Sequence, residues 1–453
     1  MSIHYITVTA ITNFFKPATR AFGDIAIVGV ADSDSLGPIG IPVAITNPDN
    51  VGVFPETTLT AAATAADTTL TVAPLAGTPT TPFNVRMENE IVTVTAVPTS
   101  TSLTVTRGVA PTTAVAHASG TSVLLATKDR AVDDPGDATN NVPPSWFKGD
   151  LGAAVRKAFV QTPPPTMVWA VRAKSKAVTD LTAALNEVAK LDVQIVVLAN
   201  TPLVSAAVGT AEIELLSQHV TSVSNTGGDG KERIGVAMLG KGDPTILIPL
   251  ITGNMKNERM VFIAHRSTED AAAAVAGAIA GYEPQISLIL KPVSISMPTL
   301  FSDAEIEALD KARVNWLTSP TLIPGGAIYM GEGYTLGADK PYIDIIRTID
   351  DISFRLKAQL IRSIGNLRIS RSGLRTLTAQ MTAIMEPLRL RQVIESFDAF
   401  LPLQVLLDKD PASLSTAELA QISNAESARI VDALISVFYA GAIHRLNITL
   451  KFN

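Results

Sequence analysis

The sequence predicts a multidomain chain of mixed α/β and α+β class. We expect a doubly wound α/β-like middle domain, a small inserted all-β module, and an α+β C-terminal domain whose terminal strands are exchanged between copies. Three patterns predict this: apolar runs alternate with helical segments, a threonine-rich stretch alternates with period two, and both ends read as bare strands. With 453 residues, 47% of them hydrophobic, the chain is long enough to bury several cores.

The two ends of the sequence share the period-two pattern of an extended strand. In the N-terminal arm (1–20) and the C-terminal arm (442–453), alternate positions on one face are Ile3, Tyr5, Thr7 and Thr9, and Ile443, Arg445, Asn447, Thr449 and Lys451. A strand needs a ladder as well as a covered face, so we expect each arm to add to a sheet of a neighbouring copy. The alternative is that both arms pair within their own domain.

The first half of the chain contains a threonine-rich segment. There are 20 threonines between Thr57 and Thr127, in alternating runs separated by Pro and Gly. Because Thr and Val suit pleated surfaces, this predicts an all-β module over 56–128. Its runs of strand length are 69–72, 90–97, 102–106 and 122–125. We expect the module to be inserted in a loop of the middle domain, which then comprises 21–55 and 129–325.

The middle domain is predicted from repeated strand and helix patterns. Apolar runs of strand length occur at 22–30, 167–173, 193–198, 234–239 and 260–264, with helical spacing at 178–191, 211–220 and 268–280. Near-continuous apolar strands imply a mostly parallel sheet covered by helices on both faces. Ser302 and Glu305 form a capping-box pattern, and we expect the helix after it to include Val314 and Leu317 on its apolar stripe.

The C-terminal domain (326–441) is predicted to be mainly helical. Apolar residues spaced three and four apart indicate a long amphipathic helix over 342–364. We expect further helices over 386–400 and 416–439, the second leading through Gly441 into the final strand.

Composition excludes several classes of site. The chain has no cysteine, so disulfides, thiolate metal sites and cysteine nucleophiles are ruled out. Its net charge of −6 argues against a chain devoted to nucleic acid. There is no apolar run of membrane-spanning length and no signal pattern at the start, which predicts assembly in the cytosol.

No catalytic, cofactor or metal site is predicted. The five histidines lie far apart and match no metal-binding motif. The glycine-rich loop at 227–232 lacks the spacing of a phosphate loop, because Asn225 and Glu232 stand at two of the required positions. The segment 331–337 has its third glycine one residue late for a dinucleotide loop.

One stretch is strongly basic. Between Arg347 and Arg391 there are nine basic and three acidic residues. The patch is a solvated face, a surface for phosphate, or a surface that docks an acidic face of another protein. The candidate residues are Arg347, Arg355, Arg362, Arg389 and Arg391.

Residues 328–352 (IYMGEGYTLGADKPYIDIIRTIDDI) resemble the core signature of contractile tail sheath proteins: a short strand, a Gly-containing turn with a Thr-Leu pair, and a helix with an Arg-Thr pair. The sequences 89–97 and 102–125 resemble a small β-domain found in several phage tail proteins. Such modules typically decorate the outer surface, and this one supports a phage-type machine.

The resemblance implies a structural protein and not an enzyme. The implied subunits form a helical homopolymer of stacked rings around an inner tail tube, with baseplate and tail terminator proteins as further partners. No cofactor, small-molecule substrate or nucleic acid is implied, and the location is the virion tail after assembly in the host cytoplasm. Two alternatives remain: a tube or capsid protein, and an enzyme with a site near Asn200 or His265, at strand ends of the doubly wound domain.

Overall fold

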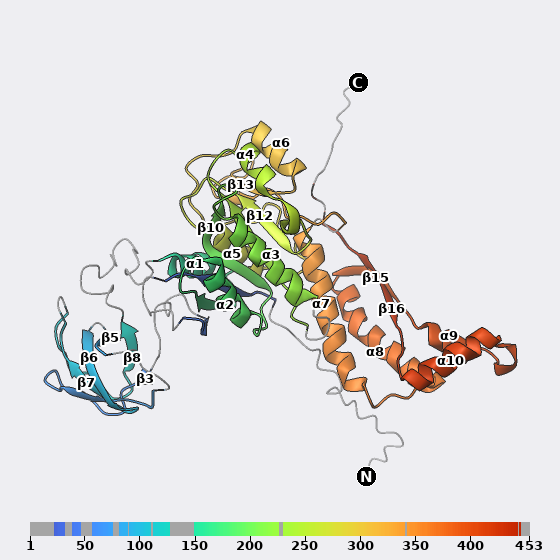
Figure 1. Cartoon of the computed structure of the whole chain (residues 1–453), viewed down its shortest axis with the longest axis horizontal. Helices are drawn as coiled ribbons and strands as arrows, with labels where there is room; N and C mark the ends of the chain where they lie inside the picture. The colour runs from blue at the N-terminus through green and yellow to red at the C-terminus, as the bar shows by residue number, and fades with distance from the viewer. Residues whose placement is uncertain are drawn as a thin grey trace, which may run out of the picture. The chain divides into compact units, whose positions relative to one another are not determined.

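The computed structural model describes residues 22–31, 39–46, 57–75, 81–88, 90–109, 112–126, 149–225, 230–339, 342–442 and 444. The chain divides into two compact units, one within 22–346 and one from Arg347 onward, and each is described by itself. The predicted multidomain, mixed α/β class is confirmed (Figure 1). None of the helices in the described ranges combines the length and apolar character that crossing a membrane requires.

The first unit contains an eight-stranded sheet in the order β14-β13-β12-β11-β10-β1-β9-β2. Its strands are β1 (Asp24–Gly29), β2 (Pro42–Ile45), β9 (Met167–Arg172), β10 (Ile195–Leu203), β11 (Ile234–Leu239), β12 (Met260–Ala264), β13 (Asn315–Thr318) and β14 (Tyr329–Met330). The strands from β9 to β13 run parallel, and the two edge strands β2 and β14 run antiparallel to their neighbours. The order of the chain reverses between β1 and β10, which is where a doubly wound sheet opens a crevice.

Helices cover both faces of this sheet, as its near-continuous apolar strands predict. On one face lie α1 (Asp150–Phe159) and α5 (Ala271–Gly281), and on the other α2 (Val178–Val188), α3 (Thr210–Ser224), α4 (Pro244–Leu247) and α6 (Asp303–Lys311) (Figure 1). Two short 3-10 helices, η5 (Ile248–Leu250) and η6 (Gly253–Met255), follow α4. Gly277 lets α5 approach α1 closely, because a Cβ there would lie 2.3 Å from the Ala158 carbonyl oxygen.

The sequence predicted the central strands of this sheet correctly, but several other elements were wrong or missing. The helix after Ser302 has its expected capping box but ends at Lys311, and Leu317 lies in strand β13. Arg313 adopts a left-handed backbone with φ of 55°, which ends the helical turn before Val314. Strand β2 and helices α1 and α4 were not predicted from the sequence.

The inserted segment forms a separate antiparallel sheet in the order β3-β8-β5-β6-β7-β4. The strands are β3 (Thr57–Thr58), β4 (Thr69–Thr71), β5 (Phe83–Met87), β6 (Glu90–Thr99), β7 (Ser102–Thr106) and β8 (Ser122–Ala126). Leu59, Leu70, Met87 and Leu103 are fully buried members of its own hydrophobic core. The threonine-rich alternating runs therefore do form an all-β structure.

A buried polar cluster ties the loop after β7 to β6. Both Glu90 carboxylate oxygens accept from Arg107, each at 2.8 Å, and one accepts from His117 Nε2 at 2.9 Å. Backbone N–H groups of Gly108 and Val115 also donate to Glu90. Burial alone raises the pKa of Glu90, but hydrogen bonds from Arg107, Val115, His117 and Gly108 together outweigh it and lower the pKa to about 2.

The second unit contains helices and one small sheet. Its elements are α7 (Ile343–Leu360, which begins before the unit boundary), η7 (Ile361–Ser363), α8 (Arg371–Leu390), β15 (Ile394–Phe400), α9 (Pro402–Asp408), η8 (Pro411–Ser413), α10 (Thr416–Ala428) and β16 (Leu434–Tyr439). The predicted amphipathic helix over 342–364 is confirmed as α7 with η7.

Two predicted helices in this unit are wrong over their second halves. Residues 394–400 and 434–439 are strands β15 and β16, and most of helix α8 was not anticipated. Gln392 and Arg429 adopt left-handed backbones with φ of 57° and 56°. Each stops a helix just before the chain becomes extended, so the helical pattern cannot continue.

Candidate assembly surface

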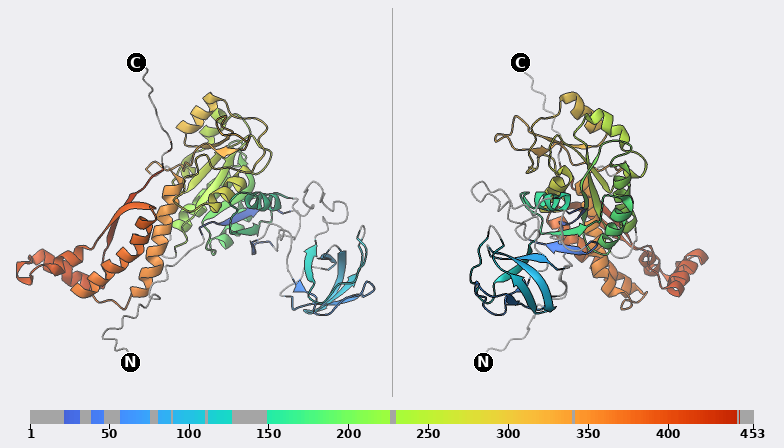
Figure 2. Two further views of the ribbon diagram at one scale, coloured as in Figure 1. Left: turned by 180° about the vertical axis from the view of Figure 1, so that it is seen from behind. Right: turned by 60° about the vertical axis from the view of Figure 1, so that its left-hand side comes forward.

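Strands β15 and β16 form a two-stranded antiparallel sheet. Its inner face packs on α8, because Ile394, Phe397 and Ile435 belong to one apolar cluster with Met385 and Leu388 (Figure 2). A two-stranded sheet is marginal by itself and gains stability from such a helix. The sheet is therefore supported on one side by its own unit.

The outer face of the same sheet exposes three large apolar side chains to water, among the polar residues Ser396, Asp398 and Ser436. Phe400 lies opposite Leu434 in the ladder, and Ser396 lies opposite Phe438. The exposed fractions are 43% for Phe400, 60% for Leu434 and 60% for Phe438. Large apolar side chains gathered on one exposed face are typical of an interaction surface.

Neither strand of this sheet has a second neighbouring strand in the part of the chain that the structure describes. There, β15 pairs only with β16 and β16 only with β15, so each strand has a second edge without a described partner. Unpaired edge groups are a template for a further strand. The β15–β16 sheet thus combines edges that have no second strand among the described residues with a face that exposes Phe400, Leu434 and Phe438.

The predicted arm residues lie outside the described residues. These are Ile3, Tyr5, Thr7, Thr9, Ile443, Arg445, Asn447, Thr449 and Lys451. Their pairing stays a prediction. The β15–β16 sheet was not predicted, although the β-branched and aromatic residues of LISVFY (434–439) are a strand signal.

The predicted basic patch is not one continuous surface. Arg347 and Arg355 are only 6% and 9% exposed, and Arg355 Nε donates to Asp351 at 2.8 Å in the same helix. These two residues are therefore removed from the patch. Helical spacing places Asp351 one turn before Arg355, which neutralises its charge locally.

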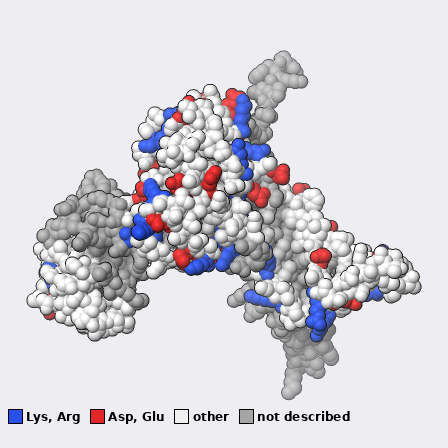
Figure 3. Space-filling view, viewed as in Figure 1, with Lys and Arg blue, Asp and Glu red and all other residues white. Residues whose placement is uncertain are grey.

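The other candidate arginines are exposed. Arg362 and Arg391 lie on the surface, and Arg389 Nε donates to Glu386 at 3.0 Å. Arg375 pairs at 2.9 Å with Asp408 of α9, an acid that lies outside the counted sequence window. Figure 3 likewise shows basic and acidic residues interspersed over the visible face.

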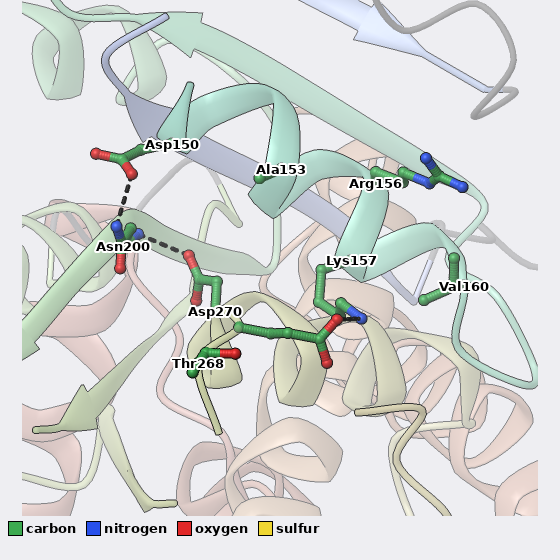
Figure 4. A pocket seen from close by; sticks show the side chains of 9 residues that line it. Asp150, Ala153, Arg156, Lys157, Val160, Asn200, Thr268 and Asp270 are labelled. Carbon is green, nitrogen blue, oxygen red and sulfur yellow. Dashed lines mark hydrogen bonds and ion pairs between the residues drawn. The ribbon is translucent and has the colours of Figure 1, made fainter. Parts of the chain in front are cut away.

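A polar pocket of about 540 Å³ lies where the doubly wound sheet changes direction, and Asn200 lines it (Figure 4). Asn200 N–H donates to Asp270 at 2.6 Å, and its side-chain amide donates to Asp150 at 2.6 Å. Asp270 also caps α5 by accepting from the Ala273 N–H. Burial raises the pKa of Asp270, and these hydrogen bonds partly offset that rise.

Two ion pairs involve residues that line this pocket. Lys176 lies 2.7 Å from Asp150, and Lys157 forms an ion pair with Glu269. His265 is not among the lining residues and is 3% exposed; burial and then the nearby Lys241 charge lower its pKa to about 4. Among the described residues, no group of three or more His, Cys, Asp or Glu is placed to hold a metal ion.

Comparison with solved structures identifies the fold. A sheath protein in the contracted PVC sheath complex of an extracellular contractile injection system matches with a TM-score of 0.50 at 10% identity, over 67% of this chain and 80% of that chain. The chain has a contractile sheath fold. The resemblance found in the sequence is thus confirmed at the level of the fold.

Other solved structures with this fold were also matched. They include the contracted helical sheath of the anti-feeding prophage (13% identity, 69% of this chain and 83% of that chain, TM-score 0.48). The sheath tail protein Lin1278 from Listeria innocua matches at 12% identity over 92% and 95% of the two chains, with a TM-score of 0.44. No protein-family model and no curated protein sequence matches this chain.

Proposed function

We propose that the chain is the structural subunit of a contractile tail sheath, which polymerises around an inner tube by exchanging β-strands. The observation that carries the proposal is the β15–β16 sheet, whose edges have no further described partner and whose outer face exposes Phe400, Leu434 and Phe438. The sheath fold supports it. The two alternating terminal segments supply strands of the right kind.

In this mechanism, residues 3–11 and 443–451 of neighbouring copies add to the two edges of the β15–β16 sheet. The result is a four-stranded sheet built from several subunits. If each arm makes about five to eight ladder bonds at roughly 1 kcal/mol net, each link contributes several kcal/mol. Such links hold neighbours together while the compact units move.

The extended polymer is proposed to be kinetically trapped. Contraction then converts it to a shorter, wider array of lower free energy and drives the tube through a target envelope. The energy is stored in subunit interfaces, so no nucleotide is required.

Several partners and placements belong to this proposal. Arg362, Arg389 and Arg391 are proposed to face the inner tube or a second subunit, with baseplate and tail terminator proteins at the ends of the polymer. The inserted module (56–128) is proposed to lie on the outer surface of a virion tail assembled in the host cytoplasm. The other proposed domain bounds are those that the sequence predicts: 1–20, 21–55 with 129–325, 326–441 and 442–453.

Electron microscopy of the purified full chain tests the proposal. We expect striated contractile cylinders from the full chain, and none after deletion of Ile443–Asn453. Smooth tubes or shells would favour the alternative of a tube or capsid protein. Dispersed particles would remove assembly as the function and favour an enzyme with a site near Asn200.

A further inference from the structure

The second unit contains an apolar groove of about 540 Å³ at the beginning of strand β16. One wall is the C-terminal end of α7 with the turn after it, and another is the first half of α8. Val431 and Ala433, just before β16, also line it. The aliphatic and methionine lining includes Leu360, Ile364, Leu377 and Met381. A volume of this size is typical of pockets that enclose a drug-sized ligand, so it holds more than one side chain.

The groove has apolar walls that face water. Ile361 is 65% exposed and Ile364 is 78% exposed, although both lie on its wall. Three cationic side chains, Lys357, Arg368 and Arg429, also line the groove. The surface is therefore an aliphatic floor with cationic groups around it.

This combination favours an aromatic occupant. Aromatic rings bury large apolar areas, and their faces attract Lys and Arg. A methionine sulfur such as that of Met381 also makes favourable contacts with ring edges. An aliphatic occupant would gain only the burial, and an acidic occupant would gain attraction to the cations but lose the burial against the aliphatic lining.

We propose that this groove receives Phe14 and Phe15 of a neighbouring copy of the chain. The inference rests on the proposed strand exchange and extends it to an anchor beyond the ladder. The two phenylalanines are adjacent, and they follow the alternating segment that we expect to pair with β16. Adjacent side chains of a strand point to opposite faces, so a strand alone does not explain a pair of large aromatic residues.

The orientation of the added strand follows from the position of the groove. Because the groove lies at the start of β16, the added segment must run antiparallel to β16 for its end to arrive there. From Ala10 to Phe14 the chain has four residues, which span at most about 14 Å when extended. Phe14 and Phe15 then lie within reach of Val431 and Ala433, next to the first ladder position at Leu434.

Cysteine cross-linking tests the proposal directly, because the natural chain has no cysteine. A chain carrying Phe15→Cys is mixed with a differently tagged chain carrying Ile364→Cys, polymerised, and oxidised mildly. A disulfide forms only where the two Cα atoms come within about 7 Å. We expect a mixed disulfide dimer in the polymer and none with the matched control Leu322→Cys, an exposed position (94%) in the first unit.

Each outcome of the cross-linking supports or overturns the assignment of the groove to Phe14 and Phe15 of a neighbouring copy. Polymers without the mixed disulfide would overturn the groove assignment and leave the sheath proposal standing. A second sample is a single chain that carries both Phe15→Cys and Ile364→Cys. A disulfide that forms only within that chain would show that the groove binds its own N-terminal segment, and would overturn binding between copies. Cross-linking of Phe452→Cys to Ile364→Cys in place of Phe15→Cys would assign the groove to the C-terminal arm. Failure of the full chain to polymerise at all would overturn both proposals.

Loss of the two rings gives an independent readout. The double substitution Phe14→Ala and Phe15→Ala should raise the protein concentration needed for polymerisation at least about tenfold, equivalent to about 1.4 kcal/mol. Ile361→Ser with Ile364→Ser should do the same, and neither pair should change the thermal unfolding of the unpolymerised chain, since both isoleucines are exposed. An unchanged critical concentration would contradict the anchor.

Discussion

Phe400 of β15 lies directly opposite Leu434 of β16, and both side chains are exposed on the face that their own unit leaves uncovered. The opposite face of the same sheet packs on α8 through Ile394 and Ile435. One face of the sheet thus packs against its own unit, and the other face is exposed to water. In the proposed assembly, strands from other copies add to the edges of this sheet, and surface from other copies covers its exposed face.

Polar substitutions on this face should impair assembly and leave folding unchanged. We expect Leu434→Ser and Phe438→Ser each to raise the concentration needed for polymerisation by roughly tenfold, since each removes about 1–2 kcal/mol of apolar burial at the interface. Sedimentation of polymers measures this. The control Ile246→Ser, at an exposed site (69%) in the first unit, should have no effect. Equal sedimentation of all variants would argue against this face as the interface.

Charge reversal tests the exposed arginines. Arg389→Glu with Arg391→Glu should weaken assembly templated by the inner tube. Added salt should likewise weaken the tube-templated assembly of the unmodified protein, because it screens the charges. Co-assembly with tube, scored by electron microscopy, is the measurement. Arg375→Glu is the control for charge reversal, because Arg375 lies on the same helix α8 but is not among the residues proposed to face the tube. Unchanged co-assembly of the double variant would remove these arginines from the tube contact.

The Glu90 cluster should make the inserted module sensitive to acid. The pKa of Glu90 is lowered from 4.5 to about 2 in the fold. The stability that this provides is complete above pH 4.5 and is lost as the pH falls toward 2; it amounts to roughly 2–4 kcal/mol. Circular dichroism melts between pH 6 and pH 2 measure the loss.

Glu90→Gln should destabilise the module by roughly 3–5 kcal/mol at neutral pH, because it leaves the Arg107 guanidinium buried without its carboxylate. It should also flatten the acid dependence. Glu88→Gln is the matched control, since the Glu88 side chain bonds the same histidine but is 63% exposed. Equal melts for the two variants would contradict the role of Glu90.

Asn315 should be important for the edge of the large sheet. Its fully buried amide donates to the carbonyl oxygens of Phe262 and Tyr334 and accepts from the Tyr334 N–H at 2.6 Å. Asn315→Ala leaves three buried backbone groups unsatisfied and should lower the free energy of unfolding by roughly 2–4 kcal/mol. Denaturant titration measures it, and exposed Asn424→Ala should change it by less than about 0.5 kcal/mol. A neutral Asn315→Ala would contradict this account.

The doubly wound sheet could be predicted because its strands are locally apolar and its helices locally periodic. Helix ends were harder to predict. Arg313, Gln392 and Arg429 each end a helix in the left-handed region with φ of 55°, 57° and 56°, where glycine is usual. Because no glycine marks these three positions, the apolar pattern continued across each helix end, and strands β13, β15 and β16 were mistaken for helix.

The candidate site was predicted only in part, because strand pairing and burial depend on distant residues. The arms show their alternation in the sequence, but β15 and β16 become strands by pairing with each other across a long stretch of chain. The segment LISVFY (434–439) has a local strand signal, but its pairing with β15 depends on a distant segment, which a local pattern does not reveal. Likewise, the burial of Arg347 and Arg355 depends on packing that a count of charges does not include.

Electron cryo-microscopy of the polymer, at a resolution that traces the main chain, tests the central claim most directly. The account predicts that residues 3–11 and 443–451 of neighbouring subunits occupy the two edges of each β15–β16 sheet. A polymer in which both terminal segments pair inside their own subunit, with those edges empty, would contradict it.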